Sequence, residues 1–348
     1  MKRINSINLI FLLFLIHAHT FAQRNTSNIH IKTFKMDSVS IRAIHPIDTK
    51  HVYYAGSNGS VGLFSAEENT TTLTVSIKYL DSLTPNFRSI ASSNNGIYAL
   101  SVGNPALLYK VSKNNYDLKY IEKNEKVFYD SMHFFDDKLH GIAVGDPTED
   151  CPSIILTDNG GETWHKIPCS KLPLFEDGEA FFAASNTNIK TIGSSVWIAS
   201  GGKKARILKS DNYGQTWDIY TTPIIQGDGP QGIYSIDFYD KENGIAIGGN
   251  YAKPLNNTAN KGITIDGGKT WTLVANQQNP NYKSCVQYVP NSNGKEIVAV
   301  GKTGISYSKD GGYSWQEISK EPFYAIKFVD KNNAWLSGNN KLGTLVFK

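Results

Sequence analysis

The sequence predicts an all-β fold, a seven-bladed β-propeller whose ring is closed by an N-terminal strand. The first observation is the composition: 19% of the 348 residues are charged, whereas Gly, Tyr and Phe occur 30, 18 and 16 times. This mixture is typical of short strands joined by many turns. The second is a short apolar strand ending in Gly that recurs roughly every 40–50 residues, a period typical of propeller blades. The third is a turn motif that follows four of these strands.

The N-terminus has the features of a secretory signal peptide. Two basic residues precede the apolar run Ile7–Ile16, and Thr20-Phe21-Ala22 places small residues at the positions of a cleavage site. A transmembrane anchor is the alternative, but the run is short for the ~30 Å of hydrocarbon in a bilayer. We therefore expect residues 1–22 to be a signal peptide and residues 23–348 to be one propeller domain. The mature protein is predicted to be periplasmic or secreted.

The charge balance argues against two classes of partner. The chain has 35 Lys and Arg against 31 Asp and Glu, and two of the basic residues lie in the predicted leader, which leaves a net charge of +2. That excess is too small for the basic footprint of a protein that binds nucleic acid or an anionic membrane. The sequence has no second long apolar segment. We expect a monomer with no nucleic-acid partner and no membrane span.

The repeat itself gives the blade count. If residues 23–348 form seven blades, each has about 47 residues, which is close to the usual length. The last copy, from Phe323 to Lys348, supplies three strands, and the early segment Ile29–Lys35 has no blade of its own. We predict that this segment is the outer strand of the last blade, because such a closure removes a free sheet edge. The seven copies of the strand are 53–56, 100–103, 142–145, 197–201, 245–248, 298–301 and 335–338.

The turn motif is Ser/Thr-x-Asp-x-Gly-x-Thr/Ser-Trp. It is complete in Thr264–Trp271 and Ser308–Trp315, and two further copies carry Asn at the acidic position. An Asp or Asn side chain caps backbone N–H groups in a turn, Gly accepts positive φ, and Trp covers the hairpin. We therefore expect a structural role for the polar residue and the Trp of each copy, which are Asn159 and Trp164, Asn212 and Trp217, Asp266 and Trp271, and Asp310 and Trp315.

On these four motifs the chain, from about residue 40 to its end, resembles the Asp-box (BNR-repeat) β-propellers, which include sialidases and sortilin-type receptors. Three further stretches resemble a bacterial exported branch related to the photosystem II stability/assembly factor family: residues 144–147, 178–185 and 248–254. The resemblance implies that the Asp boxes lie on the rim, away from the ligand face. It also implies protein partners, met during maturation of an exported complex.

The three cysteines suit an exported protein, where disulfides form. Cys151 and Cys169 bracket a hairpin with its turn near Gly160. Pairing Ile155 with His165 in that hairpin would bring the two cysteines opposite each other, so a disulfide is predicted. The third cysteine lies in an apolar strand pattern and is predicted to be a core residue. Without a CxxC motif or a cluster of His at ligand spacing, no metal site is predicted.

No cofactor is predicted either. Gly227–Gly232 matches the letters of a dinucleotide fingerprint, but Pro230 interrupts it and a strand pattern follows where a helix is required.

Long loops on one face predict where a ligand binds. They are Asp146–Ser153, Pro168–Glu179, Thr221–Tyr234, Gly248–Lys261 and Asn276–Lys283. Alignment of the repeats predicts the residues that ring the channel mouth on this face: Arg42, Arg88, Asp130, Phe182, Tyr234, Lys283 and Tyr324. Arginine forks bind carboxylates, and Tyr faces suit a sugar or a peptide. The predicted ligand-binding residues are Arg42, Arg88, Tyr251, Lys253, Lys283 and Tyr324.

Glycoside hydrolysis is the enzymatic alternative. It needs two carboxylates, or a Tyr nucleophile with a carboxylate base as in sialidases. Glu179 is the leading candidate on the ligand face. The sialidase Arg-Ile-Pro signature is absent, because the chain has Ile41-Arg42-Ala43-Ile44. The catalytic candidates are Glu179, Asp130, Asp146, Asp228 and Tyr234.

The sequence favours an exported, non-catalytic propeller that binds a ligand or partner on the long-loop face. The partner is predicted to be a protein or a glycan, and Lys203, Lys204 and Arg206 are candidates for a docking patch. A sialidase-like hydrolase acting on an anionic or polar glycan is the alternative.

Overall fold

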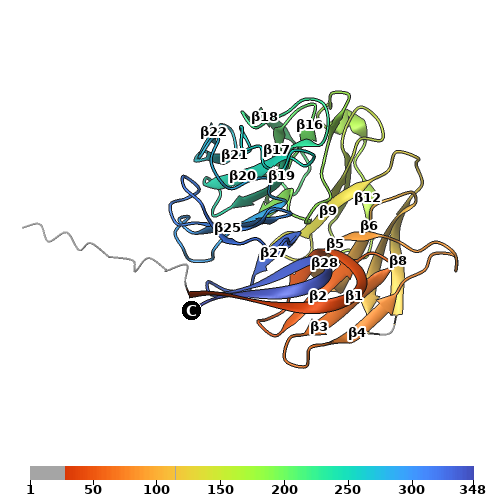
Figure 1. Cartoon of the computed structure of the whole chain (residues 1–348). Helices are drawn as coiled ribbons and strands as arrows, with labels where there is room; N and C mark the ends of the chain where they lie inside the picture. Colours follow the sequence, from red (N-terminus) through yellow and green to blue (C-terminus); the bar gives the residue numbers. More distant parts are fainter. Residues whose placement is uncertain (1–27, 114) are drawn as a thin grey trace, which may run out of the picture.

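The computed structural model describes residues 28–113 and 115–348 (Figure 1). The predicted signal peptide, residues 1–22, lies outside this part of the chain. The described residues form 28 β-strands and no α-helix, so the all-β prediction is confirmed. No helix in the described ranges is long and apolar enough to cross a membrane.

Four of the six sheets are four-stranded and antiparallel. In each of them, strands that follow one another in the chain are neighbours in the sheet. The first is β5 (Phe87–Ser93), β6 (Gly96–Ser101), β7 (Ala106–Ser112) and β8 (Asn115–Glu122). The second is β9 (Tyr129–Phe134), β10 (Gly141–Gly145), β11 (Ser153–Thr157) and β12 (His165–Lys166). The third is β14 (Ile189–Ile192), β15 (Ser195–Ala199), β17 (Arg206–Ser210) and β18 (Asp218–Thr221). The fourth is β23 (Cys285–Tyr288), β24 (Ile297–Gly301), β25 (Gly304–Ser308) and β26 (Gln316–Ser319).

The other two sheets have six strands because one long or irregular element joins two groups. One has the order β27-β28-β1-β2-β3-β4, and its strands are β1 (Ile29–Pro46), β2 (His51–Gly56), β3 (Ser60–Ser65), β4 (Thr70–Ser76), β27 (Ala325–Phe328) and β28 (Asn333–Phe347). The other has the order β13-β16-β19-β20-β21-β22, and its strands are β13 (Glu179–Ala180), β16 (Gly201–Gly202), β19 (Gln231–Phe238), β20 (Gly244–Asn250), β21 (Lys261–Thr264) and β22 (Thr272–Leu273).

The N-terminal strand lies beside the C-terminal one. β1 pairs with β28 from Ile29 opposite Phe347 to Lys35 opposite Lys341, and its second half pairs with β2. Figure 1 shows β1 and β28 next to each other, although they are at opposite ends of the sequence. β28 doubles back on itself, because the Phe347 N–H donates to the Asn332 carbonyl at 2.8 Å. The two halves of β1 thus belong to two different four-strand groups.

The first strands of the groups surround a central axis. Each contacts the next in the series β1, β5, β9, β14, β19, β23 and β27, and β27 contacts β1 again. The second strands of three groups, β10, β15 and β24, are short apolar runs that are buried along their whole length. Such runs suit sheets that are covered on both faces.

Apolar clusters fill the space between neighbouring sheets. Ala43 and Ala55, on β1 and β2, pack with Phe87 and Ala99, on β5 and β6. Phe87 is 0% exposed, and burying a Phe side chain fully stabilises a fold by about 1.5–3 kcal/mol. The core is therefore a series of layers between sheets.

The turn motifs are tightly hydrogen-bonded. Asp266 Oδ1 accepts the Lys269 and Thr270 backbone N–H groups at 3.1 and 2.9 Å, and Oδ2 accepts the Thr270 hydroxyl at 2.6 Å. Burial raises the pKa of this carboxyl, but the hydrogen bonds from Thr270 outweigh it and bring the pKa to about 2. Gly268 has φ +87°, which favours glycine there. Asn159, Asn212 and Asp310 accept the corresponding backbone N–H at 2.9–3.1 Å.

The Trp of the motif has the same contact in three copies. Trp164, Trp271 and Trp315 each donate their indole N–H to a Gly carbonyl of the same turn, at 2.9–3.1 Å. The Trp217 indole nitrogen is buried and has no hydrogen-bond partner among the described residues. In these three copies, both the Asp or Asn side chain and the Trp side chain therefore hydrogen-bond to the backbone of their own turn.

Cys151 and Cys169 are joined by a disulfide with a Cα–Cα distance of 5.6 Å. The hairpin between them has a different register from the expected one. Ile155 pairs with Lys166, not with His165, so that part of the prediction is wrong by one residue. The Asn159 turn sets the register, as turn type does in hairpins generally. Cys285 is buried and unpaired.

Candidate functional site

Two arginines lie at one end of the central axis, near the starts of the inner strands. Arg42 is on β1, and Arg88 is the second residue of β5. Each donates from Nη1 to a backbone carbonyl at 3.3 Å, Arg42 to Ala184 and Arg88 to Ala183. A guanidinium has five N–H donors, so both keep donors for a ligand. The Arg42 Cζ atom also lies 4.0 Å from the centroid of the Tyr324 ring, and this cation–π contact helps to hold the Arg42 guanidinium group in place.

Aromatic rings continue this surface. Phe182 and Tyr234 stack with ring centroids 4.0 Å apart, and the Tyr234 ring meets the edge of Tyr282 at 4.8 Å. Tyr251 packs against Tyr282 at 5.6 Å, and its ring carries the Lys302 ammonium at 3.8 Å. The row therefore offers flat apolar faces next to the arginines.

The arginines and rings line one cavity of about 240 Å³, which we call the mouth cavity. Its lining combines cations with aromatic faces and, within the described part of the chain, includes no carboxylate. The lining residues are Arg42, Arg88, Phe128, Phe181, Phe182, Ala183, Ala184, Tyr234, Tyr251 and Tyr282.

A buried acid, Asp130, lies beside Arg88. Asp130 is 0% exposed, and neither of its oxygens has a side-chain hydrogen-bond partner among the described residues. Burial, followed by the charge of Asp146, raises the pKa of Asp130 well above its usual value, against the opposing effect of Arg88. Burial also raises the pKa of Asp146 to about 6. The charged residues that line the mouth cavity itself are Arg42 and Arg88, so the cavity suits an anionic group.

Burial lowers the pKa of Arg88, whereas it raises the pKa values of the two acids. Burial, then the charge of Arg42, lowers the pKa of Arg88 from its usual value, while Asp130 raises it. An arginine remains charged even so. The Arg88 Nε is buried and has no hydrogen-bond partner in the described ranges.

Glu179 is engaged in a buried ion pair. Its side chain accepts Arg206 Nε at 2.8 Å and Nη2 at 2.5 Å, and the Ser200 hydroxyl at 2.6 Å. It is 2% exposed. A carboxylate with this set of donors has little freedom to exchange a proton with a substrate. With Asp146 it lines a different cavity of about 420 Å³, outside the mouth cavity.

Other predicted residues lie elsewhere. Lys283 is buried and donates to the Gly304 carbonyl at 2.9 Å and the Thr303 hydroxyl at 3.1 Å. Burial lowers its pKa to about 8. Lys253 is exposed in the loop after β20. Asp228 is exposed and 3.5 Å from Lys203.

The basic cluster predicted as a docking patch is neutralised. Lys203 pairs with Asp228, Lys204 with Glu176 at 3.2 Å, and Arg206 with Glu179.

Sequence reasoning missed Phe128, Phe181 and Tyr282. Alignment of the repeats selected Lys283, one residue after Tyr282, and Asp130, two residues after Phe128. Phe128 and Tyr282 both lie just before an inner strand, in connections where the repeat does not fix which side chain enters the cavity. The aromatic residue immediately before β9 and the one shortly before β23 were the available signal.

No family model matches the chain, and no curated protein does. Solved structures do match. The chain is similar to a structure titled "YCF48 bound to D1 peptide", with 14% identity, a TM-score of 0.64 and coverage of 91% of this chain and 97% of that one. It is also similar to U3-55K and to the RRP9 WD40 repeats, each with 11% identity and a TM-score of 0.62. These matches cover 93% and 94% of this chain and 99% of each of theirs. The fold shared with these structures is the β-propeller, and that prediction is confirmed.

Proposed function

We propose that this chain is an exported, non-catalytic propeller that binds a carboxylate-bearing segment of a protein partner in the mouth cavity. The observation that carries the proposal is the pair Arg42 and Arg88, whose guanidinium groups are held in place and keep free donors beside aromatic faces. Bidentate arginine is well suited to a carboxylate, and Tyr and Phe faces suit a peptide backbone or side chain. The similar YCF48 structure was solved with a peptide bound, which supports the choice of partner.

The architecture we propose for this role has seven blades with Asp-box turns, closed by β1. The pairing of Ile29–Lys35 with β28 and the cyclic contacts of the seven inner strands support it. Export is proposed from the leader sequence, and the Cys151–Cys169 bond is compatible with an oxidising compartment.

A peptide-binding experiment tests the proposal. Short random peptides with a free C-terminal carboxylate, and the same peptides amidated, are titrated into the protein and followed by calorimetry. Hydrogen bonds to charged groups contribute about 1.5–3 kcal/mol, so Arg42→Gln and Arg88→Gln should each weaken binding of the carboxylate peptides by at least about tenfold. Lys123→Gln, at an exposed lysine between β8 and β9, is the matched control. Equal binding of amidated peptides, or no effect of either arginine change, would refute the proposal.

A further inference from the structure

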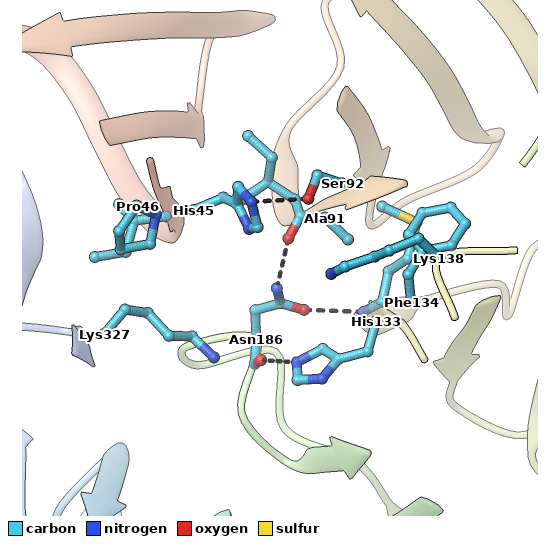
Figure 2. A pocket seen from close by; sticks show the side chains of 12 residues that line it. His45, Pro46, Ala91, Ser92, His133, Phe134, Lys138, Asn186 and Lys327 are labelled. Atoms are coloured by element: carbon cyan, nitrogen blue, oxygen red, sulfur yellow. Dashed lines mark hydrogen bonds between the residues drawn. The ribbon is translucent and has the colours of Figure 1, made fainter. Parts of the chain in front are cut away.

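The ends of the same inner strands enclose a second cavity, of about 140 Å³ (Figure 2). We call it the lysine pocket. β1 contributes His45, three residues after Arg42, and β9 contributes His133, three residues after Asp130. Its polar side chains are His45, Ser92, His133, Lys138, Asn186 and Lys327.

The two lysines point into this space without a counter-charge. Figure 2 shows the Lys138 and Lys327 side chains directed toward the region around Asn186. Neither ammonium is in an ion pair or a hydrogen bond in the described part of the chain, and no carboxylate lines the pocket. Both are half-buried. Charges removed from water are normally paired, so two unpaired ammonium groups facing one cavity indicate a site for an anion.

The acid nearest to the pocket is already neutralised. Asp237 is 2.7 Å from Lys190 Nζ and accepts the Tyr288 backbone N–H at 2.8 Å. Its charge is therefore shared with a different lysine. Lys190 and Cys285 are the other titratable groups that act on Lys327. Cys285 is fully buried and its pKa is raised by burial, so it supplies no negative charge at neutral pH.

The histidines are arranged as neutral groups. The His133 Nε2–H donates to the Asn186 carbonyl at 3.2 Å, and His45 Nε2 is 2.8 Å from the Ser92 hydroxyl. Burial, then the charges of Lys138 and Lys327, lower the pKa of His45 to about 4. Burial, then Lys327, lowers the pKa of His133 well below its usual value. Burial is thus the larger cause of both shifts, and the neighbouring lysines act in the same sense.

Asn186 forms the floor of the pocket. Its side chain accepts the Met132 backbone N–H at 2.9 Å and donates to the Ile90 carbonyl at 3.0 Å. It belongs to the segment Ala183–Asn188, whose first two carbonyls accept Arg88 and Arg42. We call this segment the plug, since it lies between the mouth cavity and the lysine pocket.

We infer that the lysine pocket binds a small multivalent oxyanion of the phosphate or sulfate class, held between Lys138 and Lys327. The size of the cavity fits this class, because it is a few times the ~30 Å³ that a water molecule occupies in the liquid. An ammonium is a compact point charge that suits an oxyanion of tetrahedral shape. The site is independent of the proposed peptide site, because it has other lining residues.

The test is a titration of the folded chain with inorganic phosphate and with sulfate, followed by calorimetry and by the NMR shifts of the His45 and His133 imidazoles. We expect saturable binding with shifts at both imidazoles. Lys138→Met and Lys327→Met should each weaken binding by at least about tenfold, whereas Lys327→Arg should retain it and Lys123→Met should leave it unchanged. Glycerol phosphate is titrated in parallel, and weaker binding than inorganic phosphate is expected because of its bulk.

Three results would overturn the inference. One is no binding of phosphate or sulfate up to about 10 mM, where even millimolar affinity would be visible. Another is binding that survives both Met substitutions, since the ion would then sit elsewhere. A third is binding without any shift of the two imidazoles. If Lys327→Met fails to fold, Lys138→Met still decides, because that lysine lies in the connection between β9 and β10.

Discussion

The two ends of the central axis are built from the same strands but carry different chemistry. At the mouth cavity, Arg42 and Arg88 are fixed by carbonyls of the plug and by aromatic rings. At the lysine pocket, Lys138 and Lys327 have no such partners in the described residues. Planar, held guanidinium groups recognise planar carboxylates, while flexible ammonium groups act as point charges. Under the two proposals, one ring presents two anion sites of different selectivity.

The plug lies between both ends, and the Asn186 side chain holds it in place. Removing that side chain should therefore have the largest effect on stability and on binding. Asn186→Ala leaves the Met132 N–H and the Ile90 carbonyl buried without partners, each costing about 1–3 kcal/mol. We expect a loss of about 2–5 kcal/mol in the free energy of unfolding and weaker binding at both ends. Urea denaturation measures the first and the two titrations measure the second. If stability falls but only the phosphate site is impaired, the two ends do not share the plug.

Acid should change the stability contributions of His45 and Asp146 with opposite sign. His45 has a folded pKa of about 4 against 6.5 when unfolded, so the unfolded state binds more protons between these values. Its contribution to stability is present above pH 6.5 and is lost as the pH falls, by about 1 kcal/mol at pH 5.5. Asp146, with its pKa raised to about 6, stabilises the fold at low pH, and that contribution is lost as the pH rises through 6.

Paired variants separate these two contributions. His45→Asn should flatten the loss of stability on acidification, and Asp146→Asn should steepen it. The measurement is the urea midpoint of each variant between pH 7 and pH 5, compared with that of the natural chain. Changes of the same sign in the two variants would contradict the opposite pKa shifts of His45 and Asp146.

The Asp266 turn should give the smallest effect, because neither Asp266 nor the residues that it caps, Lys269 and Thr270, line the mouth cavity or the lysine pocket. Two of the four turns already have Asn in place of Asp, and Asn159 makes the same backbone bond as Asp266. We expect Asp266→Asn to cost less than about 1 kcal/mol and Asp266→Ala about 1–2 kcal/mol, since the latter removes the cap. Both should leave phosphate and peptide affinity unchanged. A change in either affinity would show that the Asp266 turn is coupled to the mouth cavity or to the lysine pocket.

The sequence allowed the fold to be predicted because its repeats are local signals. A strand ending in Gly and a turn with Trp recur along the chain, and each is a complete element. The sequence predicted part of the mouth cavity. The predicted residues Arg42, Arg88, Tyr234 and Tyr251 line it. Tyr282 was missed in favour of Lys283, because both lie in the connection before β23, where the repeat does not fix which side chain enters the cavity.

The lysine pocket could not be predicted from the sequence. Lys138 lies in a turn with φ +58°, outside the repeat, and Lys327 is an isolated charge in an apolar strand. Only the folded ring brings them to the same cavity. For Glu179 the sequence predicted a functional residue where the structure has a buried ion pair. Its partner, Arg206, lies on a different strand, β17, so the pair could not be foreseen from the loop that contains Glu179.

The most direct test of the central claim is a crossed titration of three proteins, the natural chain, Arg42→Gln and Lys327→Met, with two ligands. The ligands are inorganic phosphate and a carboxylate peptide selected by the natural chain. We predict that Arg42→Gln weakens the peptide by at least about tenfold and leaves phosphate unchanged, and that Lys327→Met does the reverse. If one substitution weakens both ligands equally, or if neither weakens its own ligand, the two ends are not separate anion sites.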